Sequence, residues 1–367
     1  AGSVSGNSVI GGLVGYVDDG DNTKDVVIEH CLNSGTVQVT GKAGSGGGIV
    51  GAISKAKTIT IFDTLNAKSV TIVEGKTSNY LGSVAGTSNK TIDFTNSYFA
   101  GPQSGCPSFA SGASLNAVNS GKITVENNLG NNGYKMKNLD FANYWVAKHN
   151  STPELKSFSD TFLNDVAYDK NENPIYTIDS PEDFYEFAIR SQYEDFANST
   201  VRLGADVVAN EGTATENGWT ENDNPTVWLP IGSETKPFAG TFDGQGYTIS
   251  GIYANSTTTQ TGLFSVATGA TIKDFRLENS YIESSSGRTG SIAGRFSGRL
   301  DTVYSNAIIK NTSTSLSRYG GLIGYVDGAT TISNCWFAGS ISGNSIIGGI
   351  IGFVLYKSVK NKSKILN

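Results

Sequence analysis

A short glycine-rich phrase that returns every 28 to 36 residues places the strongest limit on how this chain can fold. The phrase reads Gly-Gly-apolar-apolar-Gly, or a near variant, and residues 261–266 hold a weaker copy. The other copies begin at Gly11, Gly47, Gly82, Gly290, Gly320 and Gly348, with spacings of 36 and 35 residues in the first half and 30 and 28 in the second. Periods of roughly 20 to 50 residues are typical of stacked or radial repeat architectures.

Between copies of the phrase lie two further short β-like runs, such as residues 331–335 (TISNC) and 339–343 (GSISG). Three short strands per period, bounded by Gly, Asn or Ser, predict one coil of a triangular solenoid, with glycine supplying the positive φ angles at the corners. A β-propeller blade is the alternative, but it needs about 40 residues and four strands. We therefore predict an all-β fold, a right-handed parallel β-helix in two consecutive runs of coils.

A longer repeat joins the two ends of the sequence. Residues 1–17 read AGSVSGNSVIGGLVGYV and residues 338–354 read AGSISGNSIIGGIIGFV, so 12 of 17 positions are identical at a separation of 337 residues. The other five positions exchange one apolar side chain for another of similar volume, which packed positions tolerate. The two segments are expected to form the same coil.

The middle of the chain interrupts the repeats. We expect residues 1–158 to form the C-terminal part of one solenoid unit, 159–174 a linker, and 175–367 the N-terminal part of a second unit. A helix is predicted near residues 181–196, because Ser180 suits the N-cap, Pro181 suits the first turn, and Phe184 and Phe187 share one face. An open solenoid end exposes unpaired edges, so this helix is expected to cap the second unit.

Composition narrows the functional classes. Charged residues make up 16% of the chain and Gly 45 of 367 residues, which is typical of β-rich extracellular proteins. The net charge is −6, and the one basic run is KSVKNKSK near the C-terminus, so nucleic acid is not an expected partner. No apolar run is long enough to predict a membrane span. Ala1 falls inside a repeat without signal-peptide features, so a mature product or an excised piece is expected.

Catalytic groups are scarce in the sequence. The two histidines, His30 and His149, do not lie in a recognisable catalytic motif, so no enzyme activity and no cofactor are expected. A glycosidase needs only two carboxylates, which leaves a polysaccharide-binding or polysaccharide-degrading protein as an alternative. The carboxylates considered for that role are Asp243, Asp274, Asp301 and Asp327.

Two further features are candidates for ligand binding. Asp18, Asp19 and Asp21 form the densest acidic loop and are a calcium candidate, although the EF-hand spacing is missing and no metal site is predicted as such. Trp219 lies in the polar stretch ENGWTENDN and is the candidate for an exposed, ligand-binding aromatic residue. The three cysteines, Cys31, Cys106 and Cys335, cannot form a disulfide framework, and Cys31 and Cys335, at the same place in their repeats, are interpreted as small apolar core residues.

Several stretches resemble the GLUG-repeat family of bacterial secreted and cell-surface proteins. They are GGLVGYV, ISNCWFAGSISG and the block WLPIGSETKPFAGTFDGQGYTISGIY at residues 228–253, and the resemblance covers residues 1–98 and 175–354. It implies a secreted or wall-attached β-helix used in adhesion or as a spacer. Some members are segments of IgA-protease-type surface proteins, but their zinc motif H-E-x-x-H is absent from this sequence.

These features together predict a non-catalytic, extracellular repeat module. It is expected to act as an adhesin segment or as the subunit of a fibre that grows by end-to-end stacking, with a glycan or protein of the host or environment as a further partner. A passive spacer for a distant catalytic domain is the remaining alternative. The expected assembly ends are Val9, Ile10, Leu13, Val14, Ile346, Ile347, Ile350 and Ile351.

Overall fold

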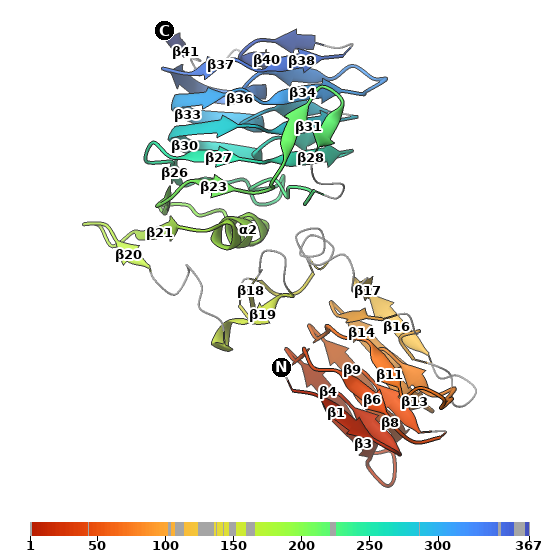
Figure 1. Ribbon diagram of the computed structural model, residues 1–367. Helices are drawn as coiled ribbons and strands as arrows, with labels where there is room; N and C mark the ends of the chain where they lie inside the picture. Colours follow the sequence, from red (N-terminus) through yellow and green to blue (C-terminus); the bar gives the residue numbers. More distant parts are fainter. Residues whose placement is uncertain are drawn as a thin grey trace. The chain divides into compact units, whose positions relative to one another are not determined.

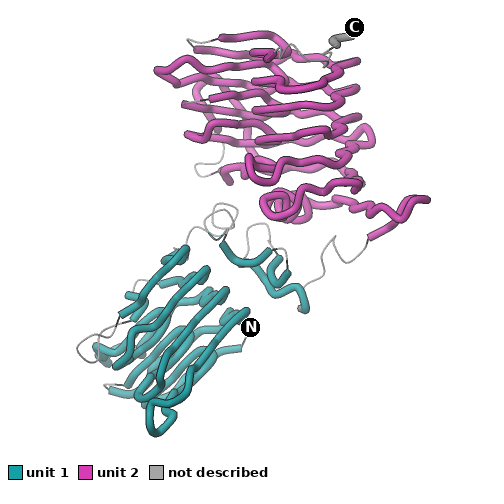
Figure 2. The backbone as a smooth tube through the Cα atoms, turned by 180° about the vertical axis from the view of Figure 1, so that it is seen from behind, with its two compact units in different colours: residues 1–146, 150–159 teal, residues 147–149, 160–367 magenta. Residues whose placement is uncertain are grey.

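The computed structural model describes residues 2–42, 44–101, 104–106, 114–123, 136, 138–141, 143–146, 152–158, 166–220, 225–285, 287–343, 346–355 and 364–366. Internal contacts divide the chain into two compact parts (Figure 2). Unit 1 comprises residues 1–146 and 150–159, and unit 2 comprises residues 147–149 and 160–367. In each unit, successive turns of the chain place their strands side by side in parallel sheets (Figure 1). The predicted all-β parallel solenoid is therefore confirmed.

Unit 1 is built from five parallel sheets of short strands. Their members, sheet by sheet, are β1 (Val4–Gly6), β6 (Val37–Val39) and β11 (Val70–Ile72); β2 (Val9–Gly11), β7 (Ser45–Gly47) and β12 (Leu81–Gly82); β3 (Val14–Asp18), β8 (Val50–Lys55) and β13 (Ala85–Ser88); β4 (Asp25–Glu29), β9 (Thr58–Phe62), β14 (Ile92–Thr95) and β16 (Leu115–Val118); β5 (Leu32–Asn33), β10 (Leu65–Asn66), β15 (Tyr98–Ala100) and β17 (Gly121–Ile123). The antiparallel pair β18 (Trp145–Val146) and β19 (Glu154–Leu155) follows, with the 3-10 helix η1 (Lys156–Phe158).

Unit 2 has longer strands and a helix at its start. Its largest sheet contains β20 (Ala167–Tyr168), β21 (Pro174–Ile178), β22 (Thr200–Leu203), β26 (Thr241–Asp243), β30 (Phe264–Glu278), β33 (Ala293–Ser305), β36 (Ile323–Ser333) and β40 (Ile351–Leu355), joined by β23 (Val207–Val208), β27 (Thr248–Ser250), β37 (Trp336–Phe337) and β41 (Lys364–Leu366). Two further sheets are β28 (Tyr253–Ser256), β31 (Tyr281–Ser284), β34 (Ile308–Asn311) and β38 (Ser340–Ser342); β29 (Gln260–Thr261), β32 (Arg288–Gly290), β35 (Arg318–Gly320) and β39 (Ile346–Gly348). The hairpin β24 (Thr213–Thr215) and β25 (Gly218–Thr220) projects from this solenoid.

The glycine-rich phrase owes its glycines to crowding, whereas positive φ angles occur at other glycines such as Gly298 and Gly328. The leading glycines Gly11, Gly47 and Gly320 are absent from the described residues with positive φ. A Cβ at Gly47 would lie 1.8 Å from the carbonyl oxygen of Val50, and Gly11 and Gly320 meet the equivalent oxygen at 1.9 and 2.0 Å. The phrase therefore marks a bend where two backbone segments approach too closely for any side chain. This bend separates β2 from β3, and a left-handed corner at His30 separates β4 from β5, so the coils of unit 1 have five strands instead of the predicted three.

Apolar side chains stack coil upon coil inside each unit. Ile28, Ile61 and Phe94 occupy equivalent, buried positions on β4, β9 and β14 in unit 1. In unit 2, Phe242, Ile272, Leu300 and Ile332 form the corresponding buried ladder on β26, β30, β33 and β36. Each coil can bury its apolar side only against its neighbours, so the core is continuous along the stack.

The predicted cap is the helix α2 (Pro181–Arg190), which lies at the start of unit 2 (Figure 1). Ser180 is its N-cap and accepts a hydrogen bond from the backbone N–H of Asp183, as expected. Phe184 stacks on Trp228, and Phe187 contacts Phe242. The predicted extent of 181–196 is wrong, because the helix ends at Arg190. The chain must then turn so that Phe196, with a φ of 55°, enters the core and β22 can begin.

Candidate functional site

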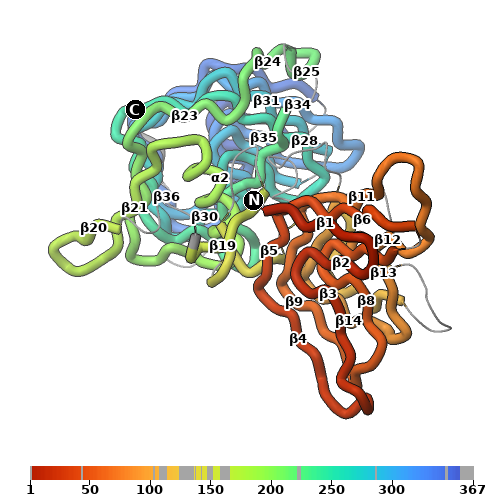
Figure 3. Tube along the Cα trace, turned by 60° about the horizontal axis from the view of Figure 1, so that its bottom comes forward, coloured from red at the N-terminus to blue at the C-terminus, as the bar shows by residue number. Residues whose placement is uncertain are grey.

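The two copies of the long repeat form equivalent strands at the outer edges of the two units. β2 and β3 of unit 1 correspond, 337 residues on, to β39 and β40 of unit 2. β1 and β38 also correspond, but their bounds differ by one residue from the 337-residue offset. In the described part of the chain, each of these strands is the last in its sheet and pairs on one side only. Figure 3 shows the coil that contains β1, β2 and β3 in red.

The coil β38–β40 of unit 2 leaves core positions uncovered. Ile347 pairs with the fully buried Tyr319, and Val354 pairs with the buried Val326, so both stand in inward-facing ladders. Their side chains are nevertheless 42% and 39% exposed. The residues at the same positions of the repeat in unit 1, Ile10 and Val17, are only 5% and 8% exposed.

The remaining predicted end residues divide by position. Val9 and Leu13 are exposed on the first coil of unit 1, whereas Val14 is half-buried against the core. Ile346, Ile350 and Ile351 are half-buried on the last coil of unit 2, and the last two pack against its core. The end residues therefore form a partly exposed apolar rim at each end. An unprotected sheet edge of this kind is prone to pair with another chain.

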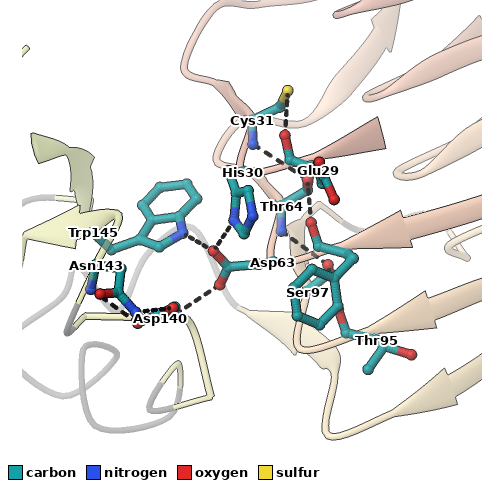
Figure 4. A network of polar contacts seen from close by, with 11 residues as sticks. Glu29, His30, Cys31, Asp63, Thr64, Thr95, Ser97, Asp140, Asn143 and Trp145 are labelled. Atoms are coloured by element: carbon teal, nitrogen blue, oxygen red, sulfur yellow. Dashed lines mark hydrogen bonds and ion pairs between the residues drawn. The ribbon is translucent and has the colours of Figure 1, made fainter. Parts of the chain in front are cut away.

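A second cluster, which the sequence analysis did not find, is centred on the fully buried carboxylate of Asp63 (Figure 4). One oxygen accepts hydrogen bonds from His30 Nδ1 at 2.7 Å and from the Trp145 indole N–H at 2.8 Å. The other oxygen accepts from the backbone N–H of Asp140 at 2.7 Å. Tyr144 stacks on the His30 ring at 3.6 Å.

The Asp63 cluster fastens the segment 138–146 onto a corner of unit 1. His30 and Asp63 occupy equivalent corner positions of successive coils, with φ angles of 51° and 47°. The side chain of Asn138 also bonds to Tyr98 and to the carbonyl of Asn119 on this corner. The available sequence signal was the alignment of IEHCLN with IFDTLN, which places a histidine beside an aspartate on adjacent coils.

The His30–Asp63 pair resembles two thirds of a catalytic triad but lacks the third member. The contacts of His30 within the described residues are with Asp63, Phe62 and Tyr144, and none of these supplies a nucleophile. The thiol of Cys31 donates instead to the carbonyl of Glu29, and burial raises its pKa. We interpret the pair as structural.

The carboxylates considered for glycoside hydrolysis have ionic or hydrogen-bonding partners. Lys273 bridges Asp243 and Asp274 at 2.6 and 2.8 Å. Burial acts to lower the pKa of Lys273, but these two hydrogen bonds outweigh it and raise the pKa overall. A hydrogen bond from Ser333, together with Arg299, lowers the pKa of Asp301. Asp327 pairs with Arg295. Asp301, whose pKa is lowered in this way, is a poor general acid.

The acidic loop is organised around its own backbone. Asp19 accepts hydrogen bonds from the N–H groups of Lys24, Asn22 and Asp21, which lower its pKa, and Asp18 accepts from Gly20. Within the described residues, no group of three or more His, Cys, Asp or Glu side chains is arranged to hold a metal ion. The calcium assignment to Asp18, Asp19 and Asp21 stays a prediction.

Trp219 lies on the β24–β25 hairpin and is half-buried. Its indole N–H donates to the carbonyl of Glu211 at 3.0 Å, and its ring meets Tyr253 edge-on. The ring is therefore engaged by its own hairpin and the adjacent wall, and its role in ligand binding stays a prediction.

Comparison with protein-family models, curated proteins and solved structures gives no match for this chain. The GLUG-repeat resemblance accordingly remains an expectation. Among the described residues, no helix has the length and apolar character needed to cross a membrane.

Proposed function

We propose that this chain is a non-catalytic structural module of a secreted or cell-surface protein, and that its open coils stack end to end on those of a second copy. The observation that carries the proposal is the exposure of Ile347 and Val354 in inward-facing positions. In unit 1 the coil β1–β3, which corresponds to β38–β40 of unit 2, is covered by the next coil, β6–β8. A coil of the same kind is therefore the natural cover for the open end of unit 2.

The second copy offers such a coil in β1–β3. Val4 on β1 pairs with the buried Val37 and is itself exposed, so this end also has an inward-facing position without a cover. Contact between the end of unit 2 and the start of unit 1 in another copy joins two different surfaces. Such a heterologous contact leaves one free end of each kind, and repetition produces a filament.

Sedimentation velocity at increasing protein concentration tests this proposal. Ile347→Lys places a charge that reaches solvent in the single chain but is desolvated in a stacked coil, so it should suppress assembly. Val208→Lys is the matched control, because Val208 is equally exposed but lies on β23, which pairs with β27 and not with the last coil. The wild type and the control should form larger species as concentration rises, and Ile347→Lys should not. A wild type that sediments as one small species throughout, or an Ile347→Lys variant that assembles normally, contradicts the proposal.

A further inference from the structure

The corner that segment 138–146 covers in unit 1 has a counterpart in unit 2 that no described segment covers. Corner residues of successive coils in unit 2 share the left-handed backbone conformation found at His30 and Asp63, with φ angles of 59°, 55° and 55° at Asp274, Thr302 and Asn334. Two residues after the corners at Asp63 and at the equivalent Asn96, which has a φ of 49°, unit 1 has the buried Leu65 and Tyr98. The same positions of unit 2 hold Arg276, Tyr304 and Trp336, stacked in register.

These residues line a groove of about 510 Å³. That volume lies within the usual range of small-molecule sites. Trp336 is 66% exposed, and its ring meets Tyr304 edge-on at 5.3 Å. The guanidinium of Arg276 lies 4.2 Å from the centre of the Tyr304 ring. The groove thus has a row of flat surfaces, with successive coils about 4.8 Å apart, along the axis of the solenoid.

The charges of the groove are already balanced. Asp274 is paired with Lys273 at 2.8 Å, and Arg276 with Glu278 at 2.6 Å. A phosphate or carboxylate ligand would have to compete with these carboxylates for its cation. The polar lining that complements a neutral ligand comes from Gln245, Thr302 and Asn334.

We propose that this groove binds a neutral saccharide chain. The C–H face of a pyranose ring matches the exposed face of Trp336, and its hydroxyl groups match the amide and hydroxyl groups along the corner. Unit 1 provides an internal precedent for this geometry, because there the corner takes up the flat ring of Tyr144 and N–H donors directed at Asp63. The proposal concerns the lateral surface of unit 2 and does not depend on end-to-end assembly.

The test is titration of the full chain with neutral hexasaccharides, namely cellohexaose, xylohexaose, laminarihexaose and chitohexaose, followed by calorimetry. At least one of them should bind, and Trp336→Ala should weaken its binding about tenfold, as expected for the loss of one stacked aromatic ring. Tyr168→Ala removes an exposed aromatic ring outside the groove and should leave the affinity unchanged. Trp336→Phe, which keeps an aromatic face, should restore part of the affinity.

Three results would overturn the proposal. The first is the absence of binding by all four probes at millimolar concentration. The second is binding that Trp336→Ala leaves unchanged, or tighter binding of the charged hexagalacturonate. The third is binding of a synthetic peptide of residues 138–146 to the groove in place of the saccharides, which would identify it as a peptide site. Ile347→Lys separates the two proposals, since it should lose assembly and still bind the saccharide as the wild type does.

Discussion

The most informative single substitution is Asp63→Ala, because one buried carboxylate receives the hydrogen bonds that fasten segment 138–146. Removing it leaves the Trp145 indole N–H fully buried without an acceptor, and the half-buried N–H of Asp140 loses its acceptor too. A buried donor without a partner costs about 1–3 kcal/mol, so the free energy of unfolding of unit 1 should fall by about 2–4 kcal/mol. His30 adds little to this sum, because its side chain is 22% exposed and can bind water.

Guanidinium unfolding and amide hydrogen exchange measure this effect together. The chain has three further tryptophans besides Trp145, so exchange in peptides of unit 1 assigns the unfolding transition to that unit, and exchange in peptides covering 138–146 should accelerate in Asp63→Ala. Asp93→Ala is the control, because Asp93 is an exposed acceptor for Asn116 and its loss should change stability by less than about 0.5 kcal/mol. Equal stability and equal exchange in the two variants would refute the structural role of the Asp63 cluster.

Two further predictions follow from burial. Burial raises the pKa values of the Cys106 and Cys335 thiols to about 11, so at pH 8 both should react with iodoacetamide far more slowly than a free thiol, until the chain is unfolded. Equal rates in the native and unfolded chains would contradict this. Phe242→Ala should destabilise unit 2 by about 3–5 kcal/mol, because Phe242 is enclosed by aromatic rings beneath α2, and calorimetry should show a lower Tm. The control Tyr168→Ala removes an exposed ring and should leave the Tm nearly unchanged.

The fold was predictable because each coil of a solenoid repeats the same sequence pattern. Each coil repeats the same requirement for apolar side chains, so the 28- to 36-residue spacing and the matched phrases at 1–17 and 338–354 were enough to place the coils. The N-cap and apolar face of α2 were equally local signals. The end of α2 could not be predicted from local sequence, because Phe196 leaves the helical path to fill a core position that exists only once the coils have assembled.

The candidate sites were harder to predict for the same physical reason. Asp63 reads as an ordinary turn residue, and its role depends on Trp145, which lies 82 residues away in the sequence. Likewise Arg276, Tyr304 and Trp336 form one row only after their coils have stacked in register. Sequence periodicity places residues within a coil, whereas a segment that folds back across several coils leaves no periodic trace.

The central claim is that the open coils are assembly surfaces, and electron microscopy of the negatively stained protein over a wide range of concentration tests it most directly. The account predicts unbranched filaments that lengthen as the concentration rises, with an axial repeat of one chain. Single particles of constant size at every concentration would contradict it.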